Sequence, residues 1–162
     1  MPCTQRAAAA LSAAPTVVST TEGRSIARQP ENTFIQSIHR LLPDTIYKQK
    51  NHNEYHAGIA DVWYDDKRDA WVEYKFLVLP VRDTTVIDLA GGKNPPITHL
   101  QQQWLAARHS NGRSVGVIVG CKEGGVWFPG VSWCEPLTVA DFRSKLLSRK
   151  ELAKVIVDLV SK

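Results

Sequence analysis

The chain has 162 residues, close to the size of one domain, and 43% of them are hydrophobic while 22% are charged. This balance is typical of a globular protein with a core and excludes disorder throughout the chain. The formal net charge of +4 permits an acidic polymer such as DNA as a partner, the lack of an apolar run of roughly 20 residues argues against a membrane protein, and three cysteines without a CxxC pair favour a reducing cytoplasm.

The N-terminal part predicts a tail followed by a helix. Residues 1–28 are rich in alanine, serine and threonine and have no sustained apolar period, so we expect a flexible tail before a single domain over residues 29–162. A helix is predicted to begin near Pro30, because proline suits the first turn, and to end before Pro43. Its buried residues would be Phe34, Ile35, Ile38, Leu41 and Leu42.

The next segment predicts a hairpin. The polar and basic residues 46–55, which include Lys48 and Lys50, fit either a solvated strand or a loop. Residues 59–64 and 70–79 are typical of two strands separated by a polar turn. The hairpin would place these two strands side by side in one sheet.

A long loop, a helix and a buried strand are predicted next. Residues 80–96 contain several glycines and prolines and indicate an irregular loop. Thr98 and Gln101 are spaced as a capping box, which starts a helix that ends near Asn111. The apolar run 115–119 fits a central strand buried on both faces.

Two further helices are predicted over residues 138–160. The pairs Thr138 with Asp141 and Ser148 with Glu151 each have the spacing of a capping box. The order helix, strands, helix, strand, helices therefore predicts an α/β fold, with a mixed central β-sheet flanked by helices.

The predicted strand 70–79 carries two charges in an apolar context. Glu73 and Lys75 are two residues apart and share one face of the strand, where burial without a partner would cost several kcal/mol per ion. Asp61, on the neighbouring strand, would bring a second carboxylate beside Glu73. Two converging carboxylates suit a hard divalent cation, Mg²⁺ or Mn²⁺. Glu31 could complete its shell directly or through water, and the set predicts phosphodiester hydrolysis with Lys75 at the phosphate.

Each of these side chains also has a structural explanation. Glu73 and Lys75 could form an ion pair on the solvent face of an edge strand, and Asp61 could end a hairpin. Glu31 could serve only the helix dipole, and Gln101 only the capping box.

Other polar and aromatic residues leave their roles open. His52 and His56 have the spacing of a helical zinc pair but lack a second ligand cluster, so phosphate contact or surface polarity explains them better. The tryptophans fit core positions better than base-stacking platforms. They are Trp63, Trp71, Trp104, Trp127 and Trp133.

A family resemblance covers about residues 30–128. It is carried by an ordered set of residues: Glu31, then Gly58-Ile59-Ala60-Asp61, then Glu73-Tyr74-Lys75, then Gln101-x-x-Trp104-Leu105. With this set the chain resembles the PD-(D/E)XK nucleases, and within them the VRR-NUC branch and phage junction-resolving endonucleases. Ala60 stands where that family usually has proline.

The resemblance implies a function and a fold. It implies a restriction-endonuclease-like core, cleavage of DNA with Mg²⁺, a preference for branched structures, and a homodimer in many relatives. Glu31, Asp61 and Glu73 would serve the metal, Lys75 the nucleophile or phosphate, and Gln101 the positioning of the site. We expect Lys48, Lys50 and Lys93 to contact DNA phosphates. A DNA-binding protein with a nuclease-like fold and no catalysis is the alternative.

Overall fold

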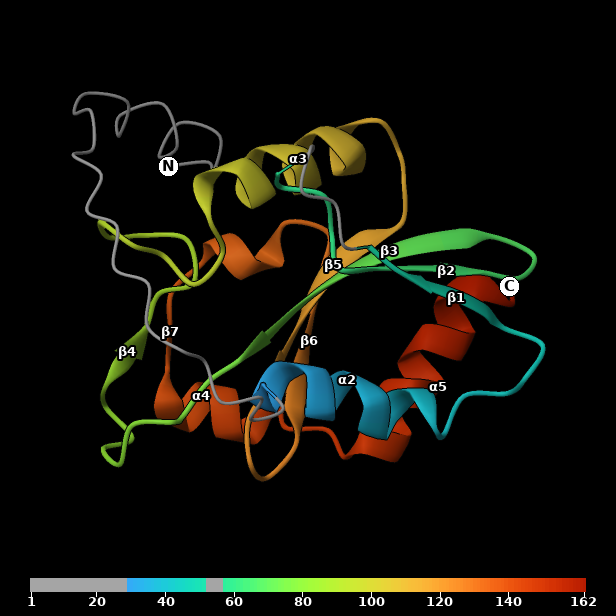
Figure 1. The fold of residues 1–162 in the computed structure, drawn as a ribbon. Helices are drawn as coiled ribbons and strands as arrows, with labels where there is room; N and C mark the ends of the chain where they lie inside the picture. The colour runs from blue at the N-terminus through green and yellow to red at the C-terminus, as the bar shows by residue number, and fades with distance from the viewer. Residues whose placement is uncertain (1–28, 52–56) are drawn as a thin grey trace, which may run out of the picture.

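The computed structural model describes residues 29–51 and 57–162. A five-stranded sheet in the order β1-β2-β3-β5-β6 forms its centre, with helices on both faces (Figure 1). The predicted α/β class with a mixed central sheet flanked by helices is therefore confirmed. The expected tail over 1–28 and the histidines His52 and His56 lie outside the described residues.

Strands follow the first helix, and the last two helices end the described chain. The helices are α2 (Pro30–His39), α3 (His99–Ser110), α4 (Val139–Ser144) and α5 (Arg149–Val160), with a short 3-10 turn at Ser132–Cys134. The strands are β1 (Tyr47–Lys50), β2 (Val62–Asp65), β3 (Asp69–Phe76), β4 (Val86–Ile87), β5 (Val115–Gly120), β6 (Gly125–Pro129) and β7 (Leu137–Thr138). No helix among the described residues is long and apolar enough to cross a membrane.

Strand β3 lies in the middle of the sheet and has two different neighbours. It pairs antiparallel with β2, where Val62 lies opposite Val72, and parallel with β5, where Glu73 lies opposite Val117. Strand β5 is buried along its whole length, as predicted for a central strand. Strand β1 is exposed at the sheet edge and pairs with β2. Of the two possibilities predicted for residues 46–55, a solvated strand or a loop, residues 47–50 therefore form the strand.

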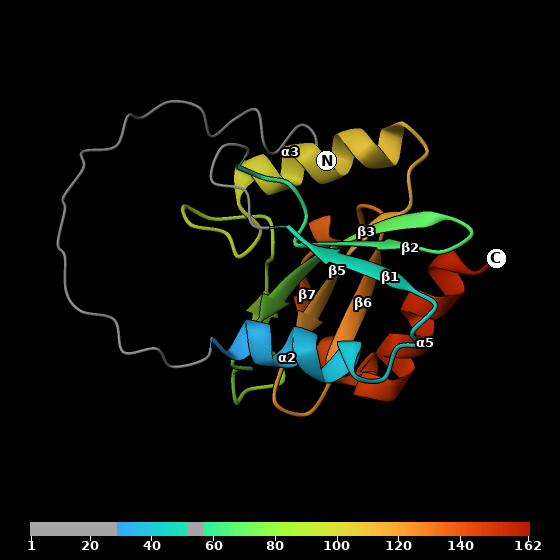
Figure 2. The same cartoon turned by 45° about the vertical axis from the view of Figure 1, so that its right-hand side comes forward.

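Helices α2 and α5 cover one face of the sheet (Figures 1 and 2). Helix α2 begins at Pro30 as predicted but ends at His39, and Leu41 beyond it is half exposed. Its buried residues pack on the alternate β-strand positions that point to this face, among them Tyr64 and Tyr74. The first turn of α2, which carries Glu31, therefore lies at one end of the sheet.

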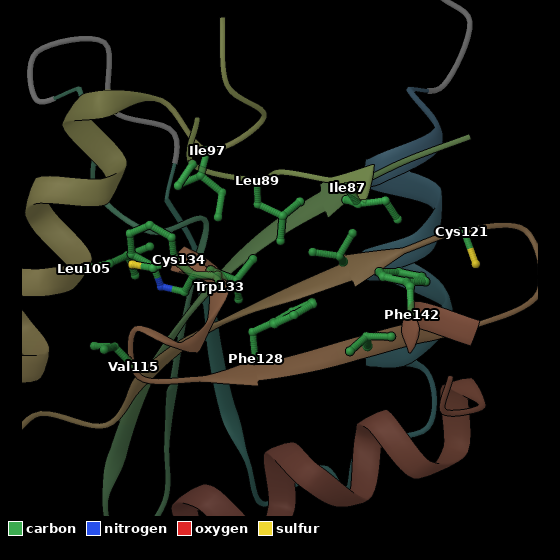
Figure 3. Close-up of a cluster of buried hydrophobic side chains, with 14 of the residues drawn as sticks. Ile87, Leu89, Ile97, Leu105, Val115, Cys121, Phe128, Trp133, Cys134 and Phe142 are labelled. Atoms are coloured by element: carbon green, nitrogen blue, oxygen red, sulfur yellow. The ribbon is translucent and has the colours of Figure 1, made fainter. Parts of the chain in front are cut away.

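The opposite face is covered by α3, α4 and the segment before α3. Residues 80–96 were expected to form a loose loop, yet β4 within it pairs with β7. Leu89 and Ile97 are 1% and 0% exposed and gather in one cluster with Trp133 (Figure 3). The backbone of this segment is irregular, but its apolar side chains are buried and form part of the core.

Candidate active site

Glu73 is the most deeply buried charged residue of the site. It lies on β3 with 0% exposure, on the face covered by α3, while its neighbours Val72 and Tyr74 point to the other face. Its Oε1 forms an ion pair with Lys75 Nζ at 2.7 Å and accepts a hydrogen bond from Gln101 Nε2. Its Oε2 is buried and has no hydrogen-bond partner among the described residues. An unpaired buried carboxylate oxygen is costly in an apolar environment and calls for a missing partner.

Asp61 lies where β2 separates from β3. It comes one residue before Val62, the last β2 residue paired with β3, so the continued register would place it opposite Glu73. The backbone N–H of Tyr74 donates to Asp61 Oδ2 at 2.9 Å, while the Ala60 carbonyl accepts from Asn51 Nδ2 at 2.9 Å. The Asp61 side chain thus accepts the backbone N–H of Tyr74, which would have bonded to a backbone carbonyl if the two strands had stayed paired.

Glu31 reaches the same end of the sheet from the first turn of α2. Burial raises the pKa of its carboxyl, and the Asp61 carboxylate raises it further, against the opposing effect of Lys75 and Lys50. Because Asp61 and Lys75 both shift the pKa of this carboxyl, Glu31 lies close enough to these two residues to interact with them electrostatically. The first-turn position also matches the helix dipole, so the two explanations of Glu31 are compatible.

The charges of Glu73 and Lys75 are coupled. Burial raises the pKa of Glu73 to about 8, and the Asp61 carboxylate adds to the rise while Lys75 opposes it. Burial lowers the pKa of Lys75, but Glu73, Asp61 and Glu31 outweigh this effect and the net pKa is raised. Lys75 is therefore a cation at pH 7, and it lies beside two carboxyls, those of Glu73 and Glu31, whose pKa values are raised.

Gln101 forms hydrogen bonds both with Thr98 at the helix start and with Glu73, while its role in a reaction stays a prediction. Its backbone N–H and side chain complete the capping box with Thr98 at the start of α3. Its Nε2 meanwhile donates to Glu73 Oε1. One amide group thus fixes both the start of α3 and the orientation of the Glu73 carboxylate.

The donor set at the sheet end fits a hard divalent cation in part. Asp61 and Glu73 supply two carboxylates, and Glu73 Oε2 is an oxygen without a partner. Within residues 29–51 and 57–162, no three histidine, cysteine, aspartate or glutamate side chains gather closely enough to hold a metal ion. Two carboxylates with water or phosphate oxygens are thus the set that these residues offer, and Glu31 as a ligand stays a prediction.

The predicted DNA-contacting lysines lie on different elements. Lys48 and Lys50 are exposed on edge strand β1, and Lys50 Nζ donates to Asn32 Oδ1, next to Glu31. Lys93 is exposed in the segment before α3. Lys50 therefore contacts the residue that follows Glu31 in α2. Contact of all three lysines with DNA stays a prediction.

Sequence reasoning missed a buried hydrogen-bond chain beneath the site. His39 Nε2 contacts Tyr64 Oη at 2.8 Å, and Tyr64 Oη contacts Tyr74 Oη at 2.6 Å. Burial, with Lys48 and Lys50, lowers the pKa of His39 to about 4, so this histidine is neutral at pH 7. The chain joins α2 to β2 and β3, and the signal was two tyrosines on the core face of adjacent strands, whose hydroxyls need partners.

The tryptophans divide into core and surface groups. Trp133 is fully buried, as expected for a core residue. Trp63, Trp71 and Trp104 are half-buried and form a row, with ring centroids 5.9 Å and 5.2 Å apart, that ends under the guanidinium of Arg108. Core packing thus describes only part of the set.

No protein-family model matches the chain, and no curated protein matches it. Among solved structures, the fold is similar to that of Hjc from Archaeoglobus fulgidus, a Holliday junction resolvase from an archaeal hyperthermophile. The TM-score is 0.46 at 12% sequence identity, covering 76% of this chain and 99% of that chain. At this level of similarity the function must be argued from the residues of the site.

Proposed function

We propose that this protein is a Mg²⁺- or Mn²⁺-dependent deoxyribonuclease of the PD-(D/E)XK type. The observation that carries the proposal is the state of Glu73, a fully buried carboxylate with one oxygen held by Lys75 and Gln101 and the other left without a partner. Together with Asp61, one residue before β2, this oxygen offers hard ligands at the end of the sheet.

Each side chain would have a distinct task in the reaction. Asp61 and Glu73 would hold the cation, which when bound polarises a phosphodiester oxygen and favours deprotonation of water. Lys75 would orient the attacking water or neutralise charge that develops on the phosphate. Gln101 would keep the Glu73 carboxylate in one orientation, and Glu31 would act on the site through water.

The substrate we propose is DNA, with branched structures such as four-way junctions preferred. The resemblance to VRR-NUC and junction-resolving nucleases supports this preference. Exposed lysines at the edge strand and before α3 supply the positive charge that a phosphate backbone requires.

A non-catalytic DNA-binding protein is the second candidate. The observation in its favour is the 2.7 Å contact between Lys75 and Glu73, which already compensates the buried charge without a metal. Cleavage assays separate the two candidates directly.

The test compares supercoiled plasmid, single strands, linear duplex and a four-way junction, each with Mg²⁺ or EDTA. Asp61→Asn and Glu73→Gln preserve side-chain shape, so we expect cleavage to fall by at least about 100-fold while DNA binding in EDTA persists. Asp65→Asn, at the other end of β2 and on the same face as Asp61, is the matched control and should cut normally.

Full activity of either site variant would remove the assignment of the metal ligands. Absence of any Mg²⁺-dependent cleavage by the unmodified protein, with DNA binding retained, would favour the non-catalytic candidate.

A further inference from the structure

A groove with a positive charge bias lies between α2, the β5–β6 turn and the start of α5. This α2–α5 groove has a volume of about 520 Å³ and is lined by Thr33, Phe34, Ser37, Phe76, Lys122 and Arg149, with Pro30 at its end. Its size is within the range of sites that take a small organic group. Two of its lining residues are cations and none is an acid, so its charge complements an anion.

Arg149 is held in place by contacts with α2. Its Nε donates to Ser37 Oγ at 3.1 Å, and its guanidinium lies 5.4 Å from the centre of the Phe34 ring. As the first residue of α5, it gains nothing from the helix dipole, which disfavours a cation at this end. The side chain is thus preorganised by Ser37 and Phe34 at the wall of the groove.

The N-terminus of α2 lies between the groove and the candidate active site. Pro30 lines the groove and precedes Glu31, whereas Phe76 follows Lys75 in β3 and therefore points to the opposite face of the sheet from Glu73 and Lys75. Phe76 is partly buried, and its ring packs edge-on against that of Phe34 with centroids 5.8 Å apart. A polymer chain that leaves the site and passes around the N-terminus of α2 would reach the groove on this second face.

We propose that the α2–α5 groove binds one nucleotide of a single DNA strand that continues from the scissile phosphate. Lys122 and Arg149 would bind a backbone phosphate, and the accessible part of the Phe76 ring would stack on an unpaired base. An apolar floor with cations at the rim suits a nucleotide, whose base is flat and whose phosphate is charged. This inference rests on the proposed function, because it assigns part of the substrate of that site.

The experiment measures binding of two labelled probes to the full chain by fluorescence anisotropy in EDTA. One probe is oligothymidylate and the other is an abasic phosphodiester of the same length. Lys122→Ala with Arg149→Ala should weaken binding about tenfold or more and reduce the log-log salt slope by about 0.7, because one phosphate of a single strand is no longer neutralised. The matched control is Lys150→Ala with Lys154→Ala, which removes the same charge from exposed positions of α5 and should change binding little.

Phe76→Leu tests the base contact separately. It keeps an apolar side chain against Phe34 but removes the ring, so affinity for oligothymidylate should fall at least about fivefold while affinity for the abasic probe is kept. Thermal melting of each variant shows whether it is folded before binding is measured.

Two results would overturn the inference. One is equal affinity and salt slope for the groove pair and the control pair, and the other is an equal effect of Phe76→Leu on both probes. Because binding is measured on uncut DNA without metal, these outcomes do not depend on whether the protein cleaves DNA. Cleavage by the Asp61 and Glu73 variants reports on the proposed activity alone.

Discussion

The side-chain amide of Gln101 bonds to two different parts of the molecule, the start of α3 and the candidate site. Its oxygen accepts from the backbone N–H of Thr98, and its nitrogen donates to Glu73 Oε1. The spacing to Thr98 predicted the cap, whereas the contact with Glu73 depends on how α3 packs over β3. The two functions can be separated by changing only the nitrogen.

Gln101→Glu is the substitution that makes this separation. Glutamate also completes a capping box, so we expect the stability of α3 to be kept, but its carboxylate would replace a donor to Glu73 with a repelling acid. DNA cleavage should fall at least about tenfold. Gln101→Ala loses both contacts and should in addition lower the free energy of unfolding by about 1 kcal/mol.

Cleavage rates and urea unfolding of the two variants check this prediction. Normal cleavage by Gln101→Glu would show that the contact with Glu73 has no role in the reaction.

Glu73 predicts an unusual dependence of stability on pH. Its pKa of about 8 in the folded protein lies above the ordinary value of 4.5, chiefly because of burial. The folded state therefore holds a proton that the unfolded chain releases, so the contribution of Glu73 is complete below about pH 4.5 and is lost as pH rises through about 8. Glu73→Gln removes this dependence.

We expect the stability of Glu73→Gln relative to the unmodified protein to increase from about pH 5 to about pH 8, by an amount on the order of a few kcal/mol. Urea unfolding in EDTA at both pH values measures the difference. A difference that does not change with pH would mean that Glu73 is ionised throughout this range.

At the scale of elements, the separation of β2 from β3 creates the place for Asp61. The alternation of apolar residues predicted the hairpin and the shared face of Glu73 and Lys75, because side chains in a strand repeat every two residues. It could not predict where the two strands separate. That point depends on Asn51, which binds the Ala60 carbonyl, and on the bond from the Tyr74 N–H to Asp61.

Asp61 should accordingly have a structural role besides its proposed metal role. Asp61→Ala leaves the buried N–H of Tyr74 without a partner and should lower the free energy of unfolding by about 1–3 kcal/mol. Asp61→Asn keeps an acceptor oxygen and should be close to the unmodified protein in stability. Chemical denaturation of both variants in EDTA tests this, and equal stability of the alanine variant would show that the Tyr74 N–H finds another acceptor.

The segment 80–96 shows where local pattern fails. Its glycines and prolines correctly indicated irregular backbone, yet Ile87 and Leu89 are core residues. Ile87 is placed by the pairing of the two-residue strand β4 with β7, and Leu89 by the irregular backbone that follows β4, so neither belongs to a sustained period that the sequence could show. The exposed Lys93 is thus carried by a segment that the core holds in place.

At the scale of the whole molecule, the layers could be predicted and the site only in part. The helix, hairpin and central-strand patterns were enough for the sheet flanked by helices, because each has its own period. The site required the relative positions of α2, β2, β3 and α3, which arise only from packing. Sequence order placed Glu31, Asp61, Glu73 and Gln101 on these elements, and the structure supplied the contacts between them.

The distribution of positive charge over the whole molecule leads to the last prediction. Lys48 is exposed on edge strand β1, beside α2, and Lys93 precedes α3 on the other face of the sheet. If duplex DNA lies across β1 and the segment before α3, both lysines contact phosphates. Lys48→Ala with Lys93→Ala should then reduce the log-log salt slope of duplex binding by about 1.8, or roughly 0.9 for each phosphate.

Lys150→Ala with Lys154→Ala again serves as the control, because it changes the net charge equally at positions along α5. Anisotropy titrations with a linear duplex at several salt concentrations in EDTA give the slopes. Equal slopes for the two pairs would mean that binding depends only on net charge, whereas a smaller slope for the Lys48 and Lys93 pair alone would place the duplex across β1 and the segment before α3.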